Sequence, residues 1–205
     1  MIDPRSPRFY LNRVTSSRLK LREMETMSER KRLEEMFTHH SFVDFRWINP
    51  QTIVVSQWVR MKCMFGCREY GANASCPPNM PSVRECERFF RDYKKAAIFH
   101  FEKKVDKPED RHEWTKEVNT KLLKLERDVF VAGYPKTFLV FMDTCYFCKD
   151  CAGTRTQCLN KKYARPTPEA LAVDVFSTVK QVGYPIEVLS DYSQKMNRYA
   201  FLMIE

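Results

Sequence analysis

The stretch "KTFLVFMDTCYFCKDCAGTRTQC", from Lys136 to Cys158, joins the two features on which the fold depends. Its first part, Lys136 to Asp143, is dominated by apolar side chains and ends just before Cys145. A short continuous apolar run of this kind is typical of a buried strand. We therefore expect an interior strand that carries the chain directly into a cysteine-rich loop.

The cysteines of this loop have a spacing that suits an inorganic centre. Cys145, Cys148 and Cys151 occupy every third position, and Cys158 follows. Such a run cannot place every sulfur on one face of a helix or strand, whereas a loop can turn each sulfur inward. Bacterial ferredoxins use the same spacing for three ligands of a [4Fe-4S] cluster. Zinc is the alternative, because Zn²⁺ also takes four thiolates.

A second cysteine group lies earlier, in "CMFGCREYGANASCPP", which contains Cys63, Cys67 and Cys76. The two prolines that follow Cys76 restrict the backbone beside its sulfur. We expect a second metal centre here, so that the chain holds one or two [4Fe-4S] clusters. Three thiols leave the fourth position to Cys86, to Cys158, to a non-thiol ligand or to substrate. Cys86 also fits the apolar face of a predicted helix, where a free thiol packs well.

The cysteine content bears on the compartment. Seven of the eight cysteines fall into these two short segments. The N-terminus lacks the apolar region of a secretory signal, and no apolar run approaches the roughly 20 residues of a membrane span. We therefore expect a cytoplasmic protein with no membrane contact. In a reducing compartment, clustered cysteines favour metal ligation over disulfides.

The formal charge of +9 raises the question of a nucleic-acid partner. Residues 1–35 hold nine Lys and Arg but also six Asp and Glu, a mixture typical of a solvated helix. We therefore expect no nucleic acid. Around the group from Cys145 to Cys158, the one acid, Asp150, is outnumbered by five cations: Lys149, Arg155, Lys161, Lys162 and Arg165. This excess either stabilises an anionic cluster, docks a redox partner protein or binds a small anionic ligand.

The order of predicted elements indicates an α/β or α+β fold. We expect a flexible N-terminal extension over residues 1–27 and a single cysteine-rich, metal-binding domain over residues 28–205, with a mixed β-sheet flanked by helices and two cysteine-rich loops. Ser28 is the expected N-cap of the first helix. The expected helices are 28–38, 81–93, 108–133 and 167–183, and the expected strands are 52–59, 96–102, 136–143, 186–189 and 198–205.

The two cysteine motifs and their surroundings resemble a known family. The runs "WVRMKCMFGCREYGANASCPP" and "CYFCKDCAGTRTQC", with "YARPTPEALAVDVFSTVKQVGYPIEV" after them, are similar to a prokaryotic family of predicted metal-binding proteins, a domain of unknown function. The resemblance covers residues 30–205. It implies a metal or iron-sulfur site at Cys63, Cys67, Cys76, Cys145, Cys148, Cys151 and Cys158, and it implies no particular reaction.

Three other residues are candidates for binding a ligand beside such a centre. Arg165 and Glu169 flank the start of the helix predicted at 167–183, where free N–H groups attract anions. The alternative is a capping carboxylate at Glu169 and a surface arginine. Tyr70, between Cys67 and Cys76, either donates a proton to a ligand or hydrogen-bonds a sulfur. Asp174 is a further candidate to assist.

The chemistry leaves two main function classes. The first is an iron-sulfur protein in electron transfer, either as a carrier or as a small redox enzyme or reductase component. The second is a non-redox enzyme in which an iron with an open position acts as a Lewis acid. A zinc-stabilised binding module is a third possibility. No catalytic acid and base can be identified, so the sequence leaves open whether the chain is an enzyme. It also leaves open whether a homodimer shares the thiols.

Overall fold

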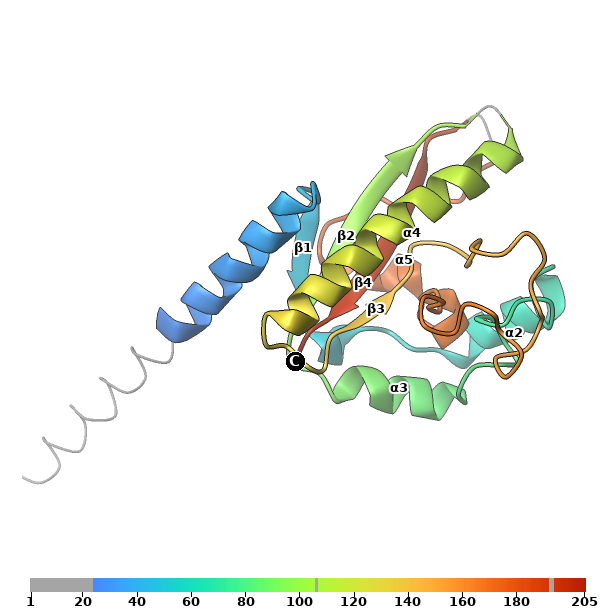
Figure 1. The fold of residues 1–205 in the computed structure, drawn as a ribbon. Coiled ribbons are helices and arrows are strands. Elements are labelled where there is room, and N and C mark those ends of the chain that lie inside the picture. The colour runs from blue at the N-terminus through green and yellow to red at the C-terminus, as the bar shows by residue number, and fades with distance from the viewer. Residues whose placement is uncertain (1–23, 106, 192–193) are drawn as a thin grey trace, which may run out of the picture. The chain divides into compact units, whose positions relative to one another are not determined.

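The structure is a computed structural model that describes residues 24–105, 107–191 and 194–205 (Figure 1). The chain divides into two units, Met1–Ser41 and Phe42–Glu205. In the first unit, residues 24–39 are helical, which confirms the helix expected at 28–38. Ser28 lies inside that helix, so its prediction as the N-cap is wrong. Residues 1–23 of the expected flexible extension lie outside the described residues, and residues 24–27 are helical.

The second unit contains a four-stranded sheet in the order β1-β2-β4-β3. Its strands are β1 (Phe45–Ile48), β2 (Ala96–Lys103), β3 (Phe138–Val140) and β4 (Met196–Met203). The combination of helices with a sheet confirms the fold class. Every pairing is antiparallel, however, where we expected a mixed sheet. The β2 and β3 strands do run in the same direction, but β4 lies between them and pairs with both.

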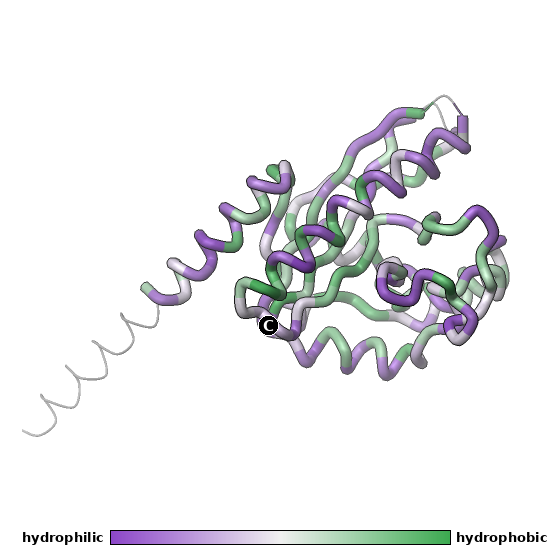
Figure 2. The backbone as a smooth tube through the Cα atoms, in the orientation of Figure 1, coloured by the Kyte–Doolittle hydropathy of each residue, from purple (hydrophilic) through white to green (hydrophobic). Residues whose placement is uncertain are grey.

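Helices cover the two faces of this sheet. Helix α4 (Pro108–Val131) lies along one face (Figure 1), and its predicted apolar stripe is buried from Val118 to Val129. Glu126 of α4 accepts a hydrogen bond from the backbone N–H of Leu139 at 2.8 Å, which ties the helix to β3. Strands β2 and β4 are apolar along most of their length (Figure 2), as burial under helices requires.

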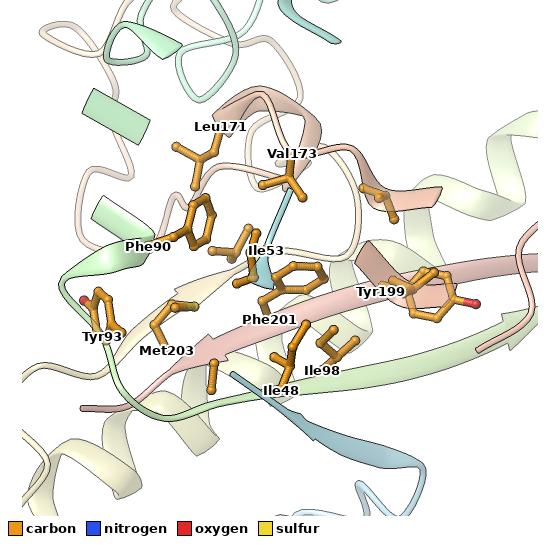
Figure 3. Packing of buried hydrophobic residues seen from close by; sticks show 14 of the residues in the cluster. Ile48, Ile53, Phe90, Tyr93, Ile98, Leu171, Val173, Tyr199, Phe201 and Met203 are labelled. Atoms are coloured by element: carbon orange, nitrogen blue, oxygen red, sulfur yellow. The ribbon is translucent and has the colours of Figure 1, made fainter. Parts of the chain in front are cut away.

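The opposite face of the sheet carries the main hydrophobic core. Helices α3 (Val83–Arg91) and α5 (Val175–Gln181) and the single turn η2 (Glu169–Leu171) pack there. Figure 3 shows Phe90, Leu171 and Val173 facing Phe201 and Ile98 of the strands. Ser82 and Glu85 form a capping box that starts α3. The core therefore joins the sheet to the segments on either side of both cysteine groups.

The predicted strand at 52–59 is wrong. The structure has a 3-10 turn η1 (Pro50–Thr52) and helix α2 (Gln57–Gly66) instead. The β-branched residues between them are extended, but only Val55 forms a bridge, to Val173. A strand needs a partner along its whole length, and here the chain turns into α2 after Ser56.

Two further predictions need correction. The helix expected at 167–183 is divided, because Ala172 adopts a left-handed conformation with φ of 61° after η2. Asp174 then caps α5 by accepting a hydrogen bond from the Ser177 N–H at 3.0 Å. The strand expected at 186–189 is absent, and that segment forms neither helix nor strand. Across the described part of the chain, no helix has the length and apolar content of a membrane span.

Candidate metal centre

The two cysteine-bearing segments are hydrogen-bonded to each other. Asn73 donates a side-chain hydrogen bond to the carbonyl of Cys145 at 3.3 Å, and Asn79 donates one to the carbonyl of Gly153 at 2.9 Å. The N–H of Arg155 donates in return to the Asn79 side chain at 3.3 Å. Segments about 75 residues apart in sequence are thus brought into one region, which sequence spacing did not predict.

The first set of thiols, here called the loop thiols, consists of Cys145, Cys148, Cys151 and Cys158. As expected, a buried strand, β3, leads into them, and residues 144–164 form neither helix nor strand. Burial raises the pKa of the Cys145 thiol, and the neighbouring charges of Cys158, Cys148 and Cys151 raise it further. Cys145 therefore lies near enough to the other three loop thiols for their charges to oppose its ionisation.

Two N–H groups point at sulfurs of the loop thiols. The side-chain amide of Asn160 donates to Cys148 Sγ at 3.0 Å. The backbone N–H of Ala74, from the other cysteine segment, donates to Cys151 Sγ at 3.3 Å. Such donors stabilise a thiolate and, in iron-sulfur proteins, raise the reduction potential of the cluster.

The second set, here called the cavity thiols, consists of Cys63, Cys67 and Cys76. Cys63 lies in the last turn of α2 and Cys67 is the C-cap residue, so their four-residue spacing places both on one side of the helix. Cys76 is buried in the loop that follows. The spacing of the first two cysteines could have indicated a helix here, but the β-branched residues before it suggested a strand.

Ionisation of two cavity thiols, Cys63 and Cys76, is disfavoured in the absence of a cation. Burial raises the pKa of Cys76 to about 12, and the charges of Glu69, Cys67, Cys63 and Cys145 add to this effect. Cys145 is among these charges, and the N–H of Ala74 reaches Cys151 Sγ, so the two sets of thiols lie in one region. A bound metal cation reverses this balance, because a coordinating thiol is deprotonated outright. The donor set therefore fits a cationic centre.

The cavity thiols line a large cavity of about 1410 Å³. Its walls also include Tyr70, Glu169 and Asp174, three residues that the sequence singled out. No loop thiol is among the described residues that line it. Ligand pockets in proteins are usually about 300–1,000 Å³, so this cavity can hold a sizeable molecule.

A half-buried polar network that sequence reasoning missed forms part of the cavity wall. Asp143 pairs with Arg111 at 2.9 Å and lies 3.5 Å from Arg198. Arg111 also donates to the hydroxyl of Tyr146 at 3.4 Å, and the Tyr146 ring stacks on His112 with centroids 4.1 Å apart. Asp143 lies between β3 and Cys145, where the predicted strand ended, and this position was a usable signal. Arg111 and Arg198 come from distant segments, and nothing in the sequence indicated that they would lie beside Asp143.

Glu169 lies at the junction of the cavity and the cavity thiols. Its carbonyl accepts a long hydrogen bond from Cys63 Sγ at 3.9 Å. Glu169 is exposed to water, and partial desolvation at the cavity wall raises the pKa of its carboxyl, although the charge of Arg198 opposes the shift. Glu169 therefore lies next to Cys63 on the cavity wall. The segment that begins at Glu169 is a single turn, η2, rather than a long helix.

Arg165 and Cys86 lie outside the cavity. Arg165 forms a two-point ion pair with Glu126 of α4, at 3.1 and 2.8 Å, so it ties the end of the cysteine loop to the helix. Its role as a ligand anchor stays a prediction. Cys86 is fully buried in the hydrophobic core, and its thiol is 3.6 Å from the carbonyl of Pro81. It packs as an apolar side chain, as one of the two interpretations expected.

Within residues 24–105, 107–191 and 194–205, no three His, Cys, Asp or Glu side chains converge as the ligands of a single ion do. Tetrahedral zinc with Zn–S bonds near 2.3 Å holds its sulfurs about 3.8 Å apart. A cluster binds its thiolates at separate iron atoms and does not require convergence on one point. The identity of the metal stays a prediction.

Comparison with known proteins identifies one family. The family described as "Predicted metal-binding protein (DUF2284)" matches residues 46–204, which include both sets of thiols and the residues that line the cavity. No curated protein and no solved structure matches the chain.

Proposed function

Because the chain belongs to the DUF2284 family of predicted metal-binding proteins, we propose that it is an iron-sulfur protein that acts as a small redox enzyme or reductase component. The loop thiols would hold a [4Fe-4S] cluster for electron transfer. The cavity thiols would hold a second centre at which a substrate binds. Zinc in place of the clusters is the principal alternative.

The division of the thiols into a set of four and a set of three is the observation that carries this proposal. Four thiols complete the coordination of a cube without any further ligand, and none of the four lines the cavity. Three thiols leave one position, and these three do line the cavity. The N–H donors to Cys148 and Cys151 support a redox centre rather than a purely structural one.

The chain's own residues can bind and orient a ligand in the cavity. A bound cluster supplies one-electron transfer, and an iron without a thiolate ligand supplies a Lewis acid. The Asp143 network presents Arg198 and the Tyr146 hydroxyl for a polar group of the ligand. Tyr70 lies on the same wall and can donate a hydrogen bond.

We place the protein in a reducing, cytoplasmic compartment. All eight cysteines are free thiols in the structure, including the exposed Cys67 and Cys151. Exposed thiols and thiol-bound clusters both persist better where the surroundings are reducing.

Metal analysis tests the proposal directly. The protein is purified without oxygen, and iron, acid-labile sulfide and zinc are measured on one sample, with visible and EPR spectra before and after dithionite. We expect about eight iron and eight sulfide per chain for two [4Fe-4S] centres, or about four of each for one. Stoichiometric zinc without sulfide would overturn the redox function and leave a zinc-stabilised module.

Single substitutions then assign the centres. Cys148→Ser should remove the cluster of the loop thiols, and Cys67→Ser should alter the other centre only. Cys86→Ser is the matched control, because this buried thiol belongs to the core and should leave the iron content unchanged. Equal loss of iron in Cys86→Ser and Cys148→Ser would contradict the assignment.

A further inference from the structure

The loop that carries the loop thiols also presents a basic surface. Its exposed cations are Lys149, Arg155, Lys161 and Lys162, and Asp150 is its exposed acid, which leaves a local charge of +3 (four minus one). Arg165 does not add to this charge, because it is paired with Glu126. We call these four cations with Leu159 and Tyr163 the basic surface.

Hydrogen bonds hold the basic surface against the thiols. The Arg155 guanidinium donates to the carbonyl of Lys161 at 2.8 Å, and its backbone N–H is bound by Asn79. Asn160, the residue before Lys161, donates to Cys148 Sγ, and its carbonyl accepts from the Tyr163 N–H at 2.9 Å. Arg155, Lys161 and Lys162 are therefore carried on a segment that the Asn160 side chain links to Cys148, and not on a free chain.

Two apolar side chains stand among these cations. Leu159 is 84% exposed and Tyr163 is 49% exposed. Apolar anchors with a polar rim are the usual arrangement of a protein-protein interface. Cys151, one of the loop thiols, is also exposed in this loop. A protein bound here lies directly over the loop thiols.

We propose that the basic surface is the docking site of an acidic one-electron carrier protein. This inference rests on the proposed redox function and names its partner class. The charge complementarity selects an acidic partner and speeds the encounter. Nucleic acid fits less well, because Tyr163 is the single exposed aromatic residue in the described loop from 145 to 165, and single strands bind by stacking on several.

Binding to a carrier protein tests this surface without any assay of turnover. The full chain, with its metal bound, is titrated by calorimetry with an acidic plant-type [2Fe-2S] ferredoxin at low and at physiological salt. We expect binding that weakens with salt. The double variant K161E/K162E should bind about tenfold more weakly or worse. Absence of binding by the natural chain at low salt would overturn the proposal.

The control reverses two exposed lysines elsewhere. Lys94 and Lys136 lie near the C-terminus of the chain, whereas the cysteine loop is at the other side of the unit (Figure 1). K94E/K136E should bind the ferredoxin as the natural chain does, and an equal loss in both variants would overturn the proposal. The proposal would also be overturned if a single-stranded oligonucleotide bound the natural chain more tightly than the ferredoxin does and bound K161E/K162E more weakly.

Metal content distinguishes a failure of the proposed redox function from a failure of the proposed docking site. If iron and sulfide are absent, the proposed function fails and this inference fails with it. If both are present but the ferredoxin does not bind, or binds without dependence on Lys161 and Lys162, only the docking site fails.

Discussion

The loop thiols and the cavity thiols are the same chemical group in two contrasting settings. The loop thiols come from fourteen consecutive residues without helix or strand, under a surface of cations. The cavity thiols come from the end of a helix and the loop after it, beside the carboxylates of Glu69 and Glu169. N–H groups donate to the sulfurs of the first set, whereas the charge of Glu69 raises the pKa of Cys76 in the second.

This contrast indicates that the two sets have different tasks. Cations and N–H donors stabilise the added negative charge of a reduced centre, whereas carboxylates oppose it. We therefore expect the centre at the loop thiols to have the higher reduction potential. The cavity thiols line a space for a ligand with a wall of polar side chains, whereas none of the loop thiols lines it.

The largest expected effect comes from removing the metal. The cysteine loop from 144 to 164 has few backbone hydrogen bonds of its own, whereas β2 and β4 are paired along eight residues each. Hydrogen exchange measured by mass spectrometry should show protection in the loop falling by about 100-fold or more in the metal-free chain. Protection in β2 and β4 should persist, and its simultaneous loss would show that the centres support the whole fold.

The next largest effect is on stability, and it distinguishes the paired Arg165 from the exposed cations near the loop thiols. Arg165→Met leaves the buried carboxylate of Glu126 without its charged partner, so it should lower the free energy of unfolding by about 3 kcal/mol. Lys149→Met, at an exposed position, is the control and should change it by less than about 0.5 kcal/mol. Chemical denaturation measures both. A loss of bound iron in Arg165→Met, with stability unchanged, would instead favour a role at the centre.

A smaller effect concerns the hydrogen bond to Cys148. Asn160→Ala removes an N–H that stabilises the reduced state, so the potential of the loop-thiol centre should fall by about 60 mV, which corresponds to roughly 1.4 kcal/mol for one electron. A redox titration followed by EPR measures this shift. Asn79→Ala is the control, since that amide donates to backbone carbonyls and not to a sulfur. A shift of the cavity-thiol signal alone would reverse the assignment of the two centres.

The smallest expected effect is that of Tyr70→Phe. This half-buried residue lines the cavity, so loss of its hydroxyl should leave stability within about 0.5 kcal/mol and iron content unchanged. The variant should alter only how the cavity-thiol centre responds when a small ligand such as cyanide is added, as seen in its EPR spectrum. An altered loop-thiol signal would contradict the separation of the two sites.

Much of the fold could be predicted from local pattern. The apolar periodicity of α4 and the apolar runs of β2 and β3 predicted these elements, because burial of one face leaves a direct trace in the residues. The strand expected at 52–59 failed because β-branched residues favour extended backbone without supplying a partner strand. The division of the helix at 167–183 depends on Ala172, whose left-handed conformation no local rule predicts for alanine.

The candidate site shows the same limit. The thiols, Tyr70 and Glu169 could be named in advance, because their residue types and spacing have chemical meaning. Asp143 could be suspected from its place before Cys145. Arg111, Arg198 and Tyr146 could not, since they meet only where α4, β4 and the cysteine loop come together.

The sequence by itself determined which side chains can bind a metal, and it determined the buried strand that leads to four of them. Both are local properties, written in residue type and in spacing along one segment. Only the tertiary structure decided that three thiols face a cavity, that Arg165 is paired with Glu126, and that the two cysteine segments meet. These are contacts between distant segments, which are selected by packing and hydrogen bonding across the whole core.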